Sequence, residues 1–129
     1  MTGALQTALI LLSLLQVKHL FADYFLQTPR MLSGRDEYLH LGRAQHAGLH
    51  GLFSVVVFLL VGAPLGFTLV LCLIETVVHY HIDWGKGCHA ARQRHQPTDA
   101  GYWRAFGTDQ LLHQLTYVAM VWGWAAMVA

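Results

Sequence analysis

The chain has 129 residues, of which 55% are hydrophobic and only 12% charged, and its mean hydropathy is +0.42. An ordinary soluble domain carries about 25% charged residues, so this composition predicts a membrane protein with one compact domain. The formal net charge of +1 gives no sign of a nucleic-acid partner, and the two cysteines are too few for a disulfide framework or a cysteine-based zinc finger.

Four apolar segments each have about the twenty residues needed to cross roughly 30 Å of hydrocarbon. They cover about residues 3–27, which end before Pro29; 44–62, which end before Pro64; 65–84, which end at Gly85-Lys86-Gly87; and 108–128. The sequence therefore predicts an all-α, polytopic membrane protein, a four-transmembrane-helix bundle that fills residues 1–129 as a single transmembrane domain. A cleaved signal peptide is the alternative for the first segment, but no basic residue precedes it and no small-residue cleavage site follows it.

The basic residues predict the orientation of this bundle. Seven of the eight lysines and arginines lie in the segments 28–43 and 85–107, namely Arg30, Arg35, Arg43, Lys86, Arg92, Arg94 and Arg104. Because basic loops are retained in the cytoplasm, both segments are expected there, and both termini are expected outside. The eighth, Lys18, is expected to snorkel from the first segment towards the interface.

Each apolar segment also carries two metal-capable side chains four residues apart. The pairs are His19 with Asp23, His46 with His50, His79 with Asp83, and Asp109 with His113, and Glu75 precedes His79 by another four. On a helix this spacing places both side chains on one face, about 6 Å apart along the axis. Counted from the outer end of each segment, most of them fall at roughly 22 to 28 Å, with His50 and Glu75 further into the hydrocarbon. We therefore expect all nine to converge on one centre inside the membrane.

A weak internal repeat supports this convergence. The order of His19, Asp23, His46 and His50 matches that of His79, Asp83, Asp109 and His113. The two halves are expected to be similar helical hairpins in parallel orientation, related by a pseudo-twofold axis along the membrane normal.

Histidines and carboxylates together suit a divalent metal, zinc first and manganese or iron as alternatives. Nine candidates exceed the ligands of one zinc ion, so one or two ions are expected. Two other interpretations remain open: hydrogen bonding between helices without any metal, and haem ligation. His40, His81, His89 and His95 lie off the register or in loops and are expected to be ordinary solvated or packing residues.

The strings KHLFADYFLQT, QHAGLHGL, ETVVHYHIDWGK and FGTDQLLHQLTY resemble an uncharacterised family of small bacterial inner-membrane proteins, domain of unknown function 3307. This resemblance implies a multi-pass protein of the bacterial inner membrane and supplies no substrate. A more distant similarity is to membrane-bound metal-dependent hydrolases, to which the chain cannot be aligned residue by residue.

The preferred function is a metal-dependent hydrolase that acts on a lipid ester or phosphoester at the cytoplasmic leaflet. The metal would activate a bound water, and Glu75, nearest the hydrocarbon, is the acid expected to act as base if it is not a ligand. The basic residues at the cytoplasmic mouth either hold an anionic head group of a membrane lipid or only set the topology. Two rival functions remain, a divalent-metal or proton transporter and a non-haem iron or manganese oxidoreductase. A homodimer with Gly123 at the contact also stays open.

Overall fold

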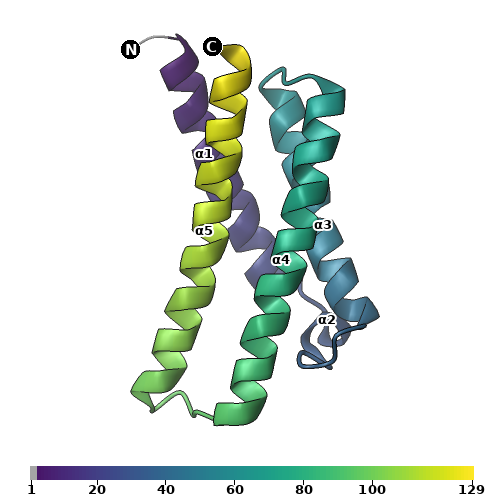
Figure 1. Ribbon diagram of the computed structural model, residues 1–129, viewed down its shortest axis with the longest axis vertical. Coiled ribbons are helices and arrows are strands. Elements are labelled where there is room, and N and C mark those ends of the chain that lie inside the picture. The colour runs from purple at the N-terminus through teal and green to yellow at the C-terminus, as the bar shows by residue number, and fades with distance from the viewer. Residues whose placement is uncertain (1–2) are drawn as a thin grey trace.

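The computed structural model describes residues 3–129, and within this range it contains helices and no strand. The elements are α1 (Gly3–Leu20), the π-helical turn η1 (Phe21–Phe25), the short helix α2 (Pro29–Leu32), α3 (Leu41–Leu60), α4 (Leu65–Gln93) and α5 (Ala100–Val128). The all-α class is therefore confirmed. The long helices α1, α3, α4 and α5 run antiparallel to their chain neighbours, and α2 lies in the loop between η1 and α3 (Figure 1).

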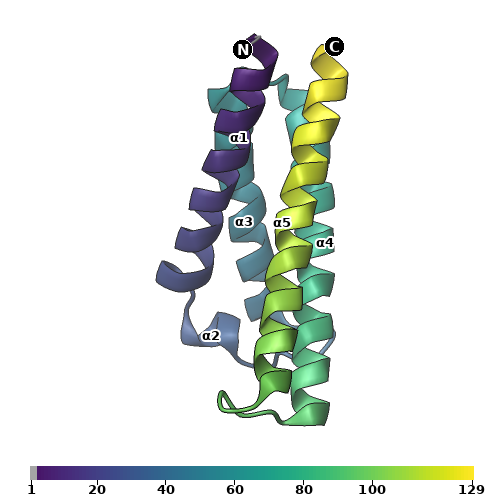
Figure 2. The ribbon, with the colours of Figure 1, turned by 90° about the vertical axis from the view of Figure 1, so that its left-hand side faces the viewer.

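These long helices form a ring. Within residues 3–129, the backbone of α1 packs against α3 and α5, and that of α4 packs against α3 and α5, while the diagonal pairs meet only through side chains in the middle of the ring. The start of α1, the end of α5 and the turn between α3 and α4 lie at one end of the bundle, which we call the terminal end (Figures 1 and 2). The connection with α2 and the connection between α4 and α5 lie at the other end, the loop end.

The distribution of polarity is that of a membrane protein. Within the described part of the chain, residues 3–129, eleven polar or charged side chains are buried, whereas large apolar side chains such as Leu73, Leu115 and Trp122 are exposed on the outside. Three helical stretches are long and apolar enough to cross a membrane: Gly3–Phe25, α4 and α5. Helix α3 is not among them, because Arg43, His46 and other polar residues in its first half lower its hydropathy.

Helices α4 and α5 are longer than the sequence predicts. Gly85-Lys86-Gly87 was expected to end the third helix, but α4 continues to Gln93, where Arg94 adopts a left-handed conformation with φ of 51°. Gly87 serves packing instead, because a Cβ atom there would collide with the backbone carbonyl of Arg35. Helix α5 begins at Ala100 rather than at about 108, so the connection between the two helices spans only residues 94–99.

The first helix does not continue to residue 27 as a regular α-helix. It passes into the π-helical turn η1, which closes with a hydrogen bond from the Leu26 N–H to the Phe21 carbonyl. The loop that follows is held by the buried Arg43, whose Nη2 donates to the carbonyls of Gly34 and Glu37. His40 caps the start of α3, since its Nδ1 accepts from the Arg43 backbone N–H at 3.3 Å.

Candidate metal centre

Five histidines, contributed by all four long helices, form one buried cluster in the middle of the ring. His79 of α4 lies at its centre, with its ring centroid 3.9 Å from that of His50 and 4.2 Å from that of His113. His46 and His19 complete the cluster: the His46 ring lies 4.7 Å from His50, and the His19 ring 5.3 Å from His50. Each of the five is at most 5% exposed.

Asp23 joins this cluster from the π-helical turn. Its Oδ1 lies 2.9 Å from Nε2 of His50 and 3.2 Å from Nε2 of His46, and its Oδ2 lies 3.2 Å from Nε2 of His19. A π-helical turn inside a helix frequently marks a functional position. Here it brings one carboxylate within reach of histidines from two helices.

Asp83 approaches the same histidines from α4. One of its oxygens lies 3.3 Å from Nε2 of His79 and 3.5 Å from Nε2 of His46, and the other lies 3.7 Å from Nε2 of His113. Two groups of ligand atoms result, in each of which all atoms lie within 4.8 Å of one another: Asp23, His46, His50 and His79, and His79, Asp83 and His113. This cluster of histidines and aspartates could hold a metal ion.

Two ion pairs flank the cluster, one on each side. On the side of the terminal end, Lys18 Nζ lies 2.5 Å from Glu75 Oε1, and the two side chains are only 5% and 1% exposed. On the side of the loop end, Lys86 Nζ lies 2.7 Å from Asp109 Oδ2. Within residues 3–129, Asp23 and Asp83 have histidines but neither lysine nor arginine as ion-pair partners.

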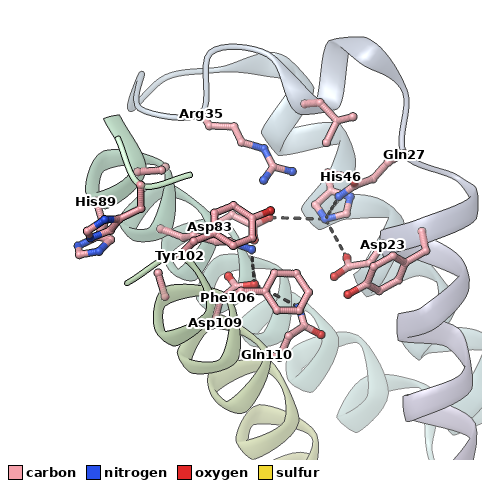
Figure 3. A pocket seen from close by; sticks show the side chains of 17 residues that line it. Asp23, Gln27, Arg35, His46, Asp83, His89, Tyr102, Phe106, Asp109 and Gln110 are labelled. Atoms are coloured by element: carbon pink, nitrogen blue, oxygen red, sulfur yellow. Dashed lines mark hydrogen bonds and ion pairs between the residues drawn. The ribbon is translucent and has the colours of Figure 1, made fainter. Parts of the chain in front are cut away.

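A cavity of about 350 Å³ leads from the loop end to this cluster. Figure 3 shows Asp23, His46, Asp83 and Asp109 pointing into it, with Arg35 above them and Tyr102 and Phe106 of α5 beside them. Of the clustered histidines, only His46 lines the cavity. Water and a polar ligand can therefore reach the carboxylate edge of the cluster from this end.

The fit of a metal can be tested on the nitrogen atoms. Among the described residues, Nε2 of His79 and both ring nitrogens of His113 are buried and make no hydrogen bond of good geometry, although Asp83 oxygens lie 3.3 and 3.7 Å from the two Nε2 atoms. Each unsatisfied buried polar atom costs about 1–3 kcal/mol. A neutral imidazole has one lone-pair nitrogen, which a metal ion would satisfy. The donor set, nitrogen and carboxylate oxygen, is one that divalent zinc accepts.

The structure places the residues expected at the centre in three positions. Asp23, His46, His50, His79, Asp83 and His113 form the two ligand groups. His19 lies beside them, with Nδ1 2.9 Å from the Tyr117 hydroxyl, and Asp109 lies against Lys86. Glu75, expected in or beside the ligand set, instead pairs with Lys18 and lies outside the cavity lining.

Sequence reasoning missed the role of Lys18. It was expected to snorkel, but it is 6% exposed and donates to the His50 carbonyl at 3.1 Å as well as to Glu75. The signal was present, because an ionisable residue inside a membrane usually pairs with another one, and Glu75 is the acid at a similar depth. Lys86 was missed because the third helix was expected to end before it.

The chain belongs to the family described as "Protein of unknown function (DUF3307)", whose model matches residues 10–128. No curated protein and no solved structure matches the chain.

Proposed function

We propose that this member of the family of unknown function is a four-span membrane protein with one divalent metal ion at the cluster, and that it hydrolyses an ester or phosphoester of a lipid. The observation that carries the metal is the balance of charge. Lys18 pairs with Glu75 and Lys86 with Asp109, which leaves the carboxylates of Asp23 and Asp83 with histidines alone around them. An isolated buried charge is very costly, and one divalent cation would balance both.

Zinc is the first choice for this ion, because three histidine nitrogens and one carboxylate oxygen make a usual four-coordinate set. Manganese and iron remain the alternatives. His79 belongs to both ligand groups, so a second ion would require both of its ring nitrogens to bind metal.

The fourth span is α3. Its polar side chains Arg43, His46 and His50 are buried in the bundle, while Leu52 and Leu60 are among the apolar side chains that it exposes. Its outer face is therefore more apolar than its average hydropathy implies. With four spans, the basic loop end is cytoplasmic and the terminal end lies outside. Labelling a cysteine added after Ala129 from one side only tests this: reaction from the cytoplasmic side would overturn it.

Hydrolysis is favoured because access to the cluster is one-sided. The cavity opens at the loop end, whereas towards the terminal end an apolar core that includes Leu11, Leu15, Phe58 and Met120 packs between the helices. A transporter needs a second opening, and an enzyme does not.

The chain's own residues can support this chemistry. A divalent ion would lower the pKa of a bound water and polarise an acyl or phosphoryl oxygen. Hydrolysis adds that water across the ester bond and yields an alcohol and an acid. Asp83, whose side chain is 22% exposed at the cavity, is placed to accept the proton from water. We assign Glu75 the role of counter-charge to Lys18 rather than of base.

The metal is tested by elemental mass spectrometry on protein purified in mild detergent. His79→Ala and His50→Ala should each reduce bound metal at least tenfold, because each removes a ligand of the group formed by Asp23, His46, His50 and His79. His95→Ala, the same substitution in the loop between α4 and α5, should retain it. A wild-type protein without metal, or full metal content in both helix variants, would refute the metal centre.

The reaction is tested with metal-loaded protein in vesicles that contain phospholipids and an isoprenoid phosphate. We expect release of a water-soluble product, and its loss in Asp83→Asn at unchanged helical content. Metal-loaded protein that releases no product from either class would overturn the hydrolase.

A transporter is the second candidate, for one specific observation. Ser54 and Thr68 are fully buried on the terminal side of the cluster, and within the described chain their hydroxyls have no hydrogen-bond partner. Together with Lys18 and Glu75 they form a series of buried polar side chains that continues from the cluster towards the terminal end. Uptake of the metal ion or of protons into sealed proteoliposomes, lost in Glu75→Gln, would favour this function over hydrolysis.

A further inference from the structure

A second hollow lies beside the metal centre, on the outside of the bundle between α4 and α5. This groove has a volume of about 800 Å³, within the usual range of small-molecule sites. Its deeper part is mainly apolar and is lined by Val77, Val78 and Ile82 of α4 and Leu112 of α5, with His81 and Thr108 as its polar members. Since α4 and α5 are both apolar enough to span a membrane, this part of the groove faces hydrocarbon.

Small residues line the groove towards the loop end, namely Gly85 of α4 and Gly101 and Ala105 of α5. The His95 ring already occupies the place of a side chain at Gly101, so the open space lies at Gly85. Small residues between membrane helices normally allow close contact of the backbones. At Gly85 no such contact exists, because a Cβ atom built there would meet no other atom within 4 Å.

The mouth of the groove is basic. Lys86, His89, His95 and Arg104 line this part. Lys86 is paired with Asp109, whereas Arg104 has no carboxylate partner within residues 3–129. An arginine presents a planar fork of donors that suits a phosphate group. The groove therefore has an apolar interior and a cationic entrance. It is complementary to an anionic lipid, which has an apolar chain and a negatively charged head group.

The groove also adjoins the cavity of the metal centre. Lys86, His89, His95, Ala105 and Asp109 line both spaces, so only these side chains separate them. Asp109 Oδ1 in turn lies 3.9 Å from His113 Nδ1. A head group held at the groove mouth would lie next to the carboxylate edge of the cluster.

We propose that the groove between α4 and α5 binds a membrane lipid with a phosphate-bearing, anionic head group, its hydrocarbon chain along Val78 and Leu112 and its phosphate at Arg104. As an assignment of the substrate class, this inference rests on the proposed hydrolase. As a lipid site, it stands on the shape and charge of the groove alone.

The test is photo-crosslinking in nanodiscs of neutral phosphatidylcholine that contain a trace of phosphatidic acid with a diazirine in its acyl chain. Labelled peptides are mapped by mass spectrometry. We expect the label to concentrate on α4 residues 77–82 and on α5 near Leu112. Gly85→Leu should reduce it at least fivefold, because the new side chain occupies the groove from a position at which a Cβ atom meets no neighbour. Gly66→Leu is the matched control on the same helix, at an exposed glycine with equally open surroundings, and should label like wild type.

The charge is tested separately with Arg104→Gln. This variant should lose label from the phosphatidic acid probe at least threefold more than from a phosphatidylcholine probe with the same photoreactive chain. Label spread evenly over the outer helix faces, or equal labelling of Gly85→Leu and Gly66→Leu, would overturn the lipid site. Equal loss from both probes in Arg104→Gln would overturn the anionic head group.

Metal content and hydrolysis are measured on the same samples, which keeps the two proposals apart. Gly85→Leu should retain its metal, and metal-free His79→Ala should still be labelled in the groove. Groove labelling without any hydrolysis would leave the lipid site standing and refute the hydrolase. Hydrolysis in wild type that Gly85→Leu does not reduce would refute the groove as the route of the substrate.

Discussion

The contribution of the buried ion pair between Lys18 and Glu75 to stability can be tested by substituting Lys18 with methionine. Lys18 Nζ lies 2.5 Å from Glu75 Oε1, and both side chains are almost fully buried. Removal of one partner of such a pair typically costs about 3–5 kcal/mol, because the other charge remains without compensation. Lys18→Met and Glu75→Gln should each reduce the free energy of unfolding by that amount.

The double variant Lys18→Met/Glu75→Gln should lose less than either single variant, since replacement of both buried charges removes the uncompensated one. Lys86→Met is the comparison within the same protein. It breaks a pair of similar length, but Lys86 is 24% exposed, so water reaches the pair and its loss should cost less. Reversible unfolding in mixed detergent micelles, followed by circular dichroism, measures all four. Single variants within about 0.5 kcal/mol of wild type, or strictly additive effects in the double variant, would refute the reasoning.

Three further predictions concern packing, the loop and the metal. Gly87→Ala should lower the unfolding free energy by about 1–3 kcal/mol, because the new methyl group collides with the carbonyl of Arg35. Gly85→Ala, in open space, should raise it by up to about 1 kcal/mol, because alanine favours the helix. The opposite order would contradict the packing described. Arg43→Lys should speed proteolysis within residues 33–40 while the helical content stays constant, because an ammonium group cannot hold both loop carbonyls as the guanidinium does. Zinc at about 100 times its dissociation constant should add about 2.7 kcal/mol to the stability of the metal-free protein and nothing to that of His50→Ala. Equal gains in both would place the zinc elsewhere.

The all-helical fold and the meeting of the histidines could be predicted because both depend on local spacing. Apolar segments of about twenty residues predict helices, and pairs such as His46 and His50 lie on one face of a helix. In one small bundle, four such polar faces can avoid lipid only by facing the interior. The structure accordingly buries five histidines together.

The features that could not be predicted depend on contacts between distant residues. Nothing in the sequence Phe21–Phe25 distinguishes a π-helical turn from a regular one, and Lys18 finds its partner 57 positions away. Gly87 resembles a helix end because glycine is common there, yet its value lies in close approach to Arg35. The continuation of α4 past Gly85 also places Lys86 beside Asp109, its ion-pair partner.

The π-helical turn has a consequence for how the first membrane segment tolerates change. A turn with hydrogen bonds to the fifth residue holds one residue more than α-helical geometry requires. If residues 21–25 formed a regular α-helix instead, everything before them would be rotated by about 100° relative to the residues that follow. Lys18 would then point away from Glu75, although both carboxylate and lysine would still be present. The extra residue in the π-helical turn therefore separates two requirements. Helix α1 turns its packing face towards its neighbours, while the turn that follows independently orients Asp23 towards the histidines.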